Sequence, residues 1–331
     1  MFNNKTILIT GGTGSFGQKM IEYLIKNYKP KKILIFSRDE YKQDLMSQSF
    51  KSDCLRYLLG DVRDKERLFF ATKKVDFIIH AAALKQVPAL EYNPMEAIKT
   101  NIMGAQNIID CAIENNVSKT IALSTDKAVN PTNLYGATKL AADKLFVAAN
   151  NFAGNQKVSF SVVRYGNVGF SRGSVIPVFL KQKKDKKNYF TITDKQMTRF
   201  WITLEQSVKF TAKCFERMHG AEIFVPKIPS VRVIDIATAI DPNYKMKIVG
   251  IRPGEKLHEV LCSIEDNKQT IEFKDYYVII PAIKIKNKNK NFKINNKKEK
   301  GKLVKDGFVY DSGTNDKFMN VSNIRKKISL R

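Results

Sequence analysis

The feature that most constrains the fold is a glycine-rich turn near the amino terminus. The turn directly follows the apolar run at residues 6–10 and leads into an amphipathic stretch that starts near residue 17. A strand, a glycine turn and a helix in this order favour a phosphate-binding unit, because glycines permit a tight turn and let the backbone approach a pyrophosphate at the helix N-terminus. The nucleotide-binding residues expected here are Gly11, Thr13, Gly14, Ser15, Phe16 and Gly17.

The first half of the chain alternates short β-branched runs with helical patterns, which predicts a parallel α/β sheet. The expected strands are residues 6–10, 32–36, 55–59, 75–80, 119–124 and 159–165. The expected helices are residues 17–27, 64–73, 95–115 and 135–150. Six strands are enough for a doubly wound sheet of the Rossmann type.

After Tyr165 the alternation breaks down, and glycine and proline recur at loop positions. We therefore expect a nucleotide-binding domain at residues 1–166 and a smaller C-terminal substrate-binding domain at residues 167–331, with residues 196–220 returning to the first domain. The Lys/Asn-rich segment 284–302 has low complexity and is interpreted as a solvated loop.

Composition narrows the choice of partners. The chain has 331 residues, is 43% hydrophobic and carries a formal net charge of +25. Because the excess lysines lie in runs with few interleaved aromatic residues, we expect neither nucleic acid nor membrane as a partner, although a basic surface would attract a nucleotide sugar. Four scattered cysteines and three histidines predict no metal site and no disulfide framework. With no signal peptide or membrane-length apolar run, the expected location is the cytoplasm.

The end of the second strand bears on the choice of cofactor. An NAD enzyme usually carries an acidic residue there, whereas this chain has Ser37 and Arg38, which can bind a 2′-phosphate with help from Lys42. NADP is therefore preferred, and Asp39 keeps NAD open as an alternative.

Asp61 and Val62 follow the third strand, so they are expected near the adenine. Asp61 could equally cap the helix that starts at Arg63.

Tyr135 and Lys139 are the residues expected to carry out proton transfer. Four residues apart on a helix, they project from one face, so the ammonium can lower the pKa of the phenol while the phenolate takes a hydroxyl proton. The spacing alone is weak evidence, since Tyr28 and Lys32 share it, but Pro30 between those two argues against a helix.

Together with the glycine turn and the H-A-A-A run at residues 80–83, these residues resemble the extended short-chain dehydrogenase/reductase family. The runs R-Y-G-N-V at residues 164–168 and R-P-G-E-K at residues 252–256 are also similar to sugar-nucleotide members. The resemblance implies that Thr125, Tyr135 and Lys139 form the oxidising triad, and that the cofactor is tightly bound and recycled. A homo-oligomer is also implied.

Two residues distinguish the possible reactions. Thr125, Asp126 and Lys127 are similar to the Thr-Asp-Lys of UDP-N-acetylglucosamine 4,6-dehydratases, whereas enzymes that retain configuration usually read Thr-Asp-Glu. The resemblance implies that a neutral Lys127, crowded by Lys85, Lys139 or the cofactor ring, removes the carbon 5 proton, and that Asp126 protonates the departing carbon 6 hydroxyl. Taken alone, this tripeptide would be a strand end leading into a turn.

The remaining site residues are also implied by the resemblance. The expected substrate-binding residues are Lys85, Thr125, Asn167, Arg199, Arg252 and Glu255, and Ala82, Gln86, Tyr135 and Lys139 complete the expected cofactor site. Arginine offers paired donors to phosphate oxygens, whereas Lys85 could instead be a solvated loop residue.

One loop departs from the family pattern. Related dehydratases read G-N-V-V-G-S-R-G-S, but here Val168 is followed by Gly169, Phe170, Ser171, Arg172 and Gly173. A glycine has moved and an aromatic residue has entered a loop near the expected sugar.

The resemblance therefore implies an NADP-dependent hydro-lyase that acts on UDP-N-acetylglucosamine and inverts carbon 5, the reaction that opens pseudaminic acid biosynthesis. A retaining dehydratase or a sugar-nucleotide epimerase is the alternative within the enzymes, with Lys127 as the discriminator. A non-catalytic NADP-binding module with a basic nucleic-acid or membrane surface is the alternative from another class.

Overall fold

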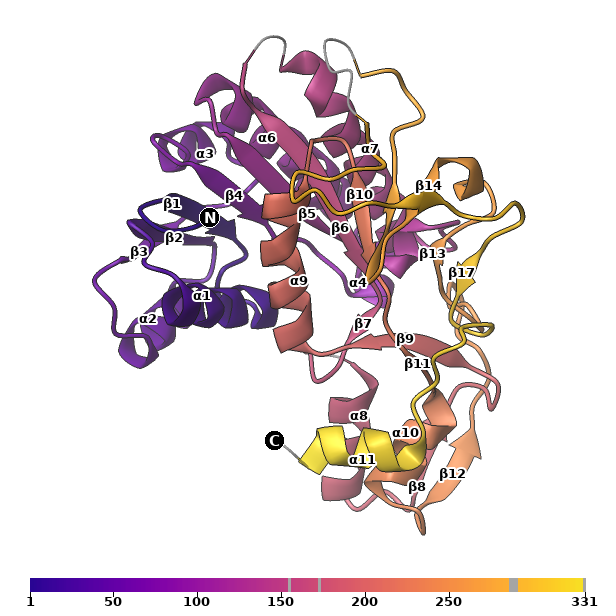
Figure 1. The fold of residues 1–331 in the computed structure, drawn as a ribbon. Helices are drawn as coiled ribbons and strands as arrows, with labels where there is room; N and C mark the ends of the chain where they lie inside the picture. Colours follow the sequence, from indigo (N-terminus) through magenta and orange to yellow (C-terminus); the bar gives the residue numbers. More distant parts are fainter. Residues whose placement is uncertain (154–155, 172–173, 286–290, 330–331) are drawn as a thin grey trace.

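A computed structural model of the chain describes residues 1–153, 156–171, 174–285 and 291–329 (Figure 1). Within these residues, the main sheet has ten strands in the order β16-β14-β15-β10-β6-β5-β4-β1-β2-β3. The strands are β1 (Thr6–Thr10), β2 (Lys32–Ser37), β3 (Leu55–Leu59), β4 (Phe77–His80), β5 (Lys119–Thr125), β6 (Ser159–Tyr165), β10 (Ile223–Pro226), β14 (Thr270–Glu272), β15 (Tyr276–Ile279) and β16 (Lys302–Leu303).

The predicted Rossmann-type sheet is confirmed. The strands from β3 to β10 pair in parallel, while β15, β14 and β16 extend the sheet antiparallel. The chain runs outward from β1 to β2 and β3, then crosses back to β4 on the other side of β1. Such a reversal opens a crevice at the carboxyl ends of the strands, where doubly wound folds bind their ligands.

Helices cover both faces of the sheet, which explains why its central strands are apolar throughout. All residues of β1 and β4 are buried. On one face α1 (Ser15–Asn27) packs against α9 (Leu204–Arg217), and on the other α6 (Gly104–Glu114) lies between α3 (Lys65–Ala71) and α7 (Leu134–Phe152). Figure 1 shows α9 and α1 on the near face of the sheet.

The predicted helix at residues 95–115 is divided in the structure. A short α5 (Pro94–Ala97) leads into a π-helical segment at Ile98–Met103, and α6 follows. Such π segments often occur at functional sites, and Thr100 within this one lines the pocket described below. The helix α2 (Glu40–Ser49) was not predicted, because it buries only Gln43 and Met46 and has little apolar periodicity.

A smaller unit forms around a second hydrophobic cluster that includes Phe179, Phe190 and Ile236. Its elements are β7 (Asn167–Val168), α8 (Val175–Lys184), β8 (Tyr189–Ile192), β9 (Thr198–Ile202), β11 (Ser230–Arg232), α10 (Val233–Ile240), β12 (Lys245–Ile248) and α11 (Val321–Ser329). In Figure 1 this unit lies below the main sheet, with β7 and β9 leading into it. A further pair, β13 (Val260–Cys262) and β17 (Tyr310–Asp311), runs beside the junction.

More of the C-terminal half joins the main sheet than the predicted residues 196–220. Within that range α9 covers the sheet, but β9 belongs to the small sheet with β7 and β11. In addition, β10, β14, β15 and β16 join the main sheet from farther along the chain.

Residues 291–302 are mostly exposed, as expected of a solvated loop, but two of their polar side chains are anchored to the folded core. Asn295 is buried and donates to Tyr276 Oη at 2.7 Å. Glu299 forms an ion pair with the buried Arg217 at 2.9 Å. Single polar anchors of this kind do not alter composition, which is why the low-complexity pattern did not reveal them.

Candidate active site

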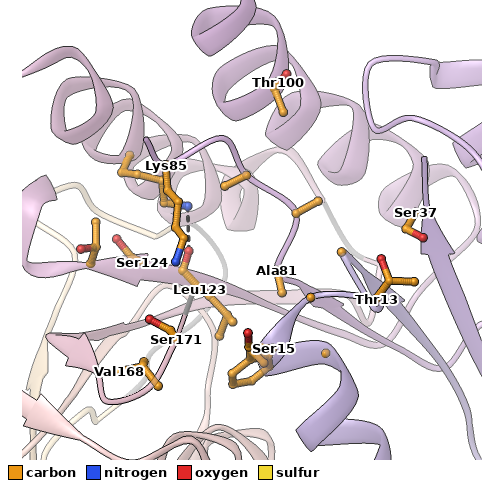
Figure 2. Close-up of a pocket in the computed structure, with 18 of the residues that line it drawn as sticks. Thr13, Ser15, Ser37, Ala81, Lys85, Thr100, Leu123, Ser124, Val168 and Ser171 are labelled. Carbon is orange, nitrogen blue, oxygen red and sulfur yellow. Dashed lines mark hydrogen bonds between the residues drawn. The ribbon is translucent and has the colours of Figure 1, made fainter. Parts of the chain in front are cut away.

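The carboxyl ends of β1, β2, β4, β5 and β6 surround a pocket of about 610 Å³. Figure 2 shows Thr13, Ser15 and Ser37 on one side of it, with Lys85 and Ser124 on the other. Of the predicted residues, the pocket is lined by Gly11, Thr13, Gly14, Ser15, Phe16, Gly17, Ser37, Arg38, Lys42, Asp61, Val62, Ala82, Lys85, Gln86, Thr125, Asp126, Lys127, Tyr135, Lys139 and Asn167. The pocket joins the expected cofactor and catalytic residues in one cavity.

The glycine turn makes one end of this pocket suitable for a pyrophosphate. Gly11 has φ +67°, and a Cβ there would lie 2.9 Å from the Ala82 backbone nitrogen. A Cβ on Gly17 would lie 2.5 Å from Gly12 Cα, so α1 can approach the turn only without a side chain. Helix α1 starts at Ser15 and has no side-chain cap, which leaves its first N–H groups directed at the pocket, as an anion requires.

Beyond the glycine turn, both acidic and basic side chains follow the end of β2. Asp39 caps α2 by accepting from the Lys42 backbone nitrogen at 2.9 Å, and its carboxylate also pairs with the Lys42 ammonium. Ser37 Oγ accepts from the buried Gln43 at 3.0 Å. Arg38, half exposed, pairs with Asp61 at 3.4 Å. Asp39, the acidic side chain at the end of β2, is therefore already engaged in capping α2 and in pairing with Lys42.

Asp61 lines the pocket and also binds locally. Its Oδ1 accepts from the Arg63 backbone nitrogen at 3.0 Å, although the cap of α3 is Asp64. Burial alone would raise the pKa of Asp61, but hydrogen bonds from Arg63 and the charge of Arg38 lower it overall.

The catalytic helix is held against the end of β5. Asn133 caps α7 by accepting from the Gly136 backbone nitrogen at 2.9 Å. A Cβ on Gly136 would lie 2.2 Å from the Lys127 carbonyl oxygen, so glycine is needed for this approach. Lys139 is buried and donates to the Leu123 carbonyl oxygen at 2.7 Å, and burial lowers its pKa.

Tyr135 differs from the expectation of a lowered pKa. Burial raises the pKa of its phenol to about 12, and Asp126 adds to the rise, although Lys127 and a hydrogen bond with Thr125 act in the opposite direction. The ammonium of Lys139 is directed to a carbonyl oxygen instead. The cation that favours the phenolate of Tyr135 is therefore Lys127, and not Lys139 as the helical spacing predicts.

Lys127 lies between two buried carboxylates. Its Nζ is 3.0 Å from Asp126 Oδ1 and 3.1 Å from Glu259 Oε1. Burial favours the neutral amine, but Asp126 and Glu259 outweigh it and raise the pKa of Lys127. The expectation of a neutral Lys127 is thus opposite to the direction found here. Lys85, whose pKa is lowered by burial and by Lys127, is the more easily deprotonated of the two.

Sequence reasoning missed Glu259, which is almost fully buried and lies just before β13. Thr125 Oγ1 donates to Asp126 Oδ1 at 2.9 Å, which joins the triad to the same cluster. An acidic residue in a loop far along the chain carries no periodic signal, and only tertiary folding brings it to Lys127.

Several buried polar atoms near the catalytic residues have no hydrogen-bond partner within the described part of the chain. Asp126 Oδ2, Glu259 Oε2 and Asn167 Oδ1 are among them. Because buried polar groups are normally paired, such atoms are suited to contacts with a polar ligand.

Three predicted substrate residues do not line the pocket. Arg199 is buried, donates to the carbonyl oxygens of Thr198 and Leu257, and lies 3.7 Å from Glu259. Arg252 and Glu255 lie on a loop and face each other at 4.0 Å, with the Arg252 side chain 65% exposed.

The loop that departs from the family pattern is only partly described, since Arg172 and Gly173 lie outside the described residues. Phe170 has φ +62°, a conformation that favours glycine. A Cβ on Gly169 would lie 2.5 Å from Trp201 Nε1. Gly169 therefore packs against Trp201 because it has no side chain, and Phe170 adopts the left-handed backbone conformation.

Within the ranges that the structure covers, no group of three His, Cys, Asp or Glu side chains could hold a metal ion. No helix in the same ranges is long and apolar enough to cross a bilayer.

Comparison with known proteins places this geometry in context. Residues 7–281 match the family described as polysaccharide biosynthesis protein. A UDP-N-acetylglucosamine 4,6-dehydratase (inverting) of Campylobacter jejuni is 61% identical over 315 residues, which cover 95% of this chain and 94% of that protein. A UDP-glucose 4-epimerase of Rickettsia bellii is 44% identical over 286 residues, 84% of each chain. The X-ray structure of Pen from Bacillus thuringiensis has a TM-score of 0.89 and 36% sequence identity, and covers 100% of this chain and 98% of that chain.

Proposed function

Because the chain belongs to the polysaccharide biosynthesis protein family, we propose that it is a UDP-N-acetylglucosamine 4,6-dehydratase that inverts carbon 5. The observation that carries this proposal is the position of Thr125, Asp126 and Lys127 at the end of β5, in one pocket with Tyr135 and Lys139. The 61% identity to an inverting dehydratase supports the same reaction, and Lys127 is the residue that favours it over simple epimerisation.

The proposed cofactor is NADP. The glycine turn and the uncapped start of α1 suit a pyrophosphate, and Arg38 with Lys42 offers positive charge at the end of β2, where a 2′-phosphate would lie. Asp39, the residue that would favour NAD, already caps α2 and pairs with Lys42. A bound nicotinamide dinucleotide would supply, in its oxidised form, a hydride acceptor for carbon 4 and a positive ring and, once reduced, the hydride donor for carbon 6.

The Tyr135 phenolate, formed when the phenol loses its own proton to solvent, takes the proton of the carbon 4 hydroxyl while that carbon becomes a ketone. Thr125 orients the phenol through a hydrogen bond, and Lys127 helps to stabilise the phenolate. Lys139 is fixed by the Leu123 carbonyl oxygen and adds a positive charge to the pocket. The ketone makes the carbon 5 proton acidic, which prepares the elimination.

Lys127 can act as the carbon 5 base once it has passed its own proton to a neighbour. Asp126 Oδ1, 3.0 Å away, is the acceptor that the geometry supports. The transfer leaves a neutral amine on Lys127 and a neutral acid on Asp126. Lys127 then takes the carbon 5 proton, and Asp126 donates its proton to the carbon 6 hydroxyl, which leaves as water. One proton shift thus prepares both the base and the acid of the elimination.

The substrate is proposed to lie against the unpaired atoms of Asn167 and Asp126, beside Lys85. The predicted phosphate contact of Arg252 remains a proposal that would require its exposed side chain to move toward the pocket, whereas Arg199 would first have to leave the carbonyl oxygens and the Glu259 carboxylate that hold it. The four free cysteines at described positions are consistent with a proposed cytoplasmic location. Homo-oligomerisation also remains a proposal.

Incubation with UDP-N-acetylglucosamine in heavy water tests the reaction. We expect a 4-keto-6-deoxy sugar with solvent deuterium at carbon 5, none delivered to carbon 6 as hydride, and L-arabino configuration in the proton coupling constants. No reduced cofactor should accumulate. A D-xylo product would reject inversion but keep dehydration, and carbon 4 epimerisation without loss of water would reject both.

A further inference from the structure

Glu259 is placed to control Lys127 without belonging to the triad or to the Thr-Asp-Lys run. Its Oε1 lies 3.1 Å from Lys127 Nζ and 3.7 Å from Arg199 Nε. The side chain is 3% exposed, so water does not screen these contacts effectively. Arg199, fixed by two backbone carbonyl oxygens, places a second positive charge beside the Glu259 carboxylate.

The backbone of Glu259 is also fixed. Its N–H donates to Ser312 Oγ at 2.8 Å, and the Ser312 N–H donates back to the Glu259 carbonyl oxygen at 2.8 Å. Ser312 Oγ lies 2.8 Å from Thr198 Oγ1, which also contacts His258 Nδ1 at 2.8 Å. The C-terminal segment and β9 therefore hold the carboxylate that faces Lys127.

We propose that Glu259 is a positioning residue that holds the Lys127 ammonium over the reaction site and keeps it protonated until Asp126 accepts the proton. This inference rests on the proposed function. After the transfer, the Glu259 carboxylate still accepts a hydrogen bond from the neutral amine, so the nitrogen lone pair keeps its direction. No proton is gained or lost by the cluster in this step, since the hydrogen moves from Lys127 Nζ to Asp126 Oδ1.

Other charges face Lys127 as well. Asp126 lies beside it on the same turn, Arg199 and Lys256 approach from the segments near β9 and β13, and Lys85 and Tyr135 approach from the other side of the pocket. The three cations favour the neutral amine and the two carboxylates oppose them. Removing the charge of Glu259 therefore shifts the balance toward neutral Lys127.

Glu259→Gln is the informative variant because it retains a hydrogen-bond acceptor but removes the charge. The elimination needs the proton that Lys127 and Asp126 share, so the rate falls once the cluster loses this proton to solvent, and we expect this alkaline limb of the kcat profile to move about one to three pH units lower in Glu259→Gln with KM little changed. Glu259→Asp, which retains the charge but withdraws the carboxylate, should keep the limb near its wild-type position and lower the plateau. Glu265→Gln, an exposed change in the same segment, is the matched control.

A second readout does not depend on turnover. Competitive acetylation of the lysines over a pH series, quantified by mass spectrometry, reports when Lys127 becomes a free amine. We expect this to occur at lower pH in Glu259→Gln than in the wild type and Glu265→Gln. If Glu259→Gln does not fold, Ser312→Ala tests the same placement and should lower kcat without changing KM.

An unmoved pH limb and unmoved Lys127 acetylation in folded Glu259→Gln would overturn the inference and leave Glu259 a structural residue only. If the wild type failed to dehydrate UDP-N-acetylglucosamine while the acetylation shift appeared, the proposed function would be lost but the Lys127–Glu259 coupling would stand.

Discussion

Replacing Lys127 by alanine should affect both catalysis and folding, and the two effects can be measured separately. As the proposed carbon 5 base, Lys127 contributes a factor on the order of 10² to 10⁴ to the rate. Its side chain is also the cation beside Asp126, which is fully buried, and Glu259, which is 3% exposed. Truncation therefore removes the base and also removes the positive charge that stabilises two buried carboxylates.

The folding cost follows from that geometry. Breaking a buried ion pair by removing one partner costs about 3–5 kcal/mol, and we take the lower end because Arg199 still faces Glu259. With an unfolding entropy of about 2.1 cal/mol/K per residue, a cost of about 3 kcal/mol in a chain of 331 residues lowers Tm by about 4 °C. The sequence alone contains no reason to expect this cost, since Glu259 is remote from Lys127 along the chain.

The pH dependence provides a further check. The folded protein raises the pKa of Lys127 above its unfolded value, so the stabilisation is fully present below the unfolded pKa and is lost as pH rises through the folded pKa. The difference in stability between wild type and Lys127→Ala should therefore be constant from about pH 7 to about pH 10 and shrink only at higher pH.

Deuterium incorporation at carbon 5 measures turnover, and thermal unfolding measures stability. Lys144→Ala, a change at an exposed lysine of α7, controls for loss of a positive charge elsewhere. Near-normal turnover in folded Lys127→Ala would refute the assignment of the base, and an unchanged Tm would show that the buried carboxylates do not need this cation.

Gly17→Ala should abolish copurified dinucleotide, measured by acid extraction, because the new Cβ would lie 2.5 Å from Gly12 Cα; normal cofactor content would contradict the glycine-turn argument. The wild-type extract should contain NADP, and Arg38→Ala should weaken NADP binding about tenfold or more in titrations while changing NAD binding little; recovery of mostly NAD from the wild type would reject the preference. Glu299→Ala should lower stability by about 1–2 kcal/mol in denaturant unfolding, because Arg217 is buried and Glu299 is partly screened; no change would restore the view of this segment as a solvated loop.

The fold was predictable because its signals are local. The six predicted strands each begin and end within two residues of the observed ones. Strands buried on both faces, such as β1 and β4, must be apolar along their length. The glycine turn then located the pocket, because the switch in strand order lies beside β1. What was missed, such as α2, lacks a strong apolar period and is held by polar contacts like that of Gln43 to Ser37.

The site was only partly predictable, because the protonation states of its residues depend on charged side chains from distant parts of the chain. The motif implied which residues would meet in the pocket, and Thr125, Tyr135 and Lys139 do meet there. It could not indicate the proton state of Lys127, because that depends on Glu259, which reaches the site from another segment. Pairwise spacing in a helix likewise could not show that Lys139 is directed to a backbone carbonyl oxygen.

The charge sum of the cluster explains why a lysine suits position 127 in this chain. Asp126 and Glu259 contribute two negative charges, which Lys127 and Arg199 balance with two positive ones. A glutamate at position 127 would replace this cation by a third carboxylate beside Asp126 and Glu259 in a buried site, and like charges at such distances cannot all remain ionised. With Glu259 present, a cationic group that can lend its proton to Asp126 satisfies both the folded structure and the elimination, whereas an acidic base would satisfy only the chemistry.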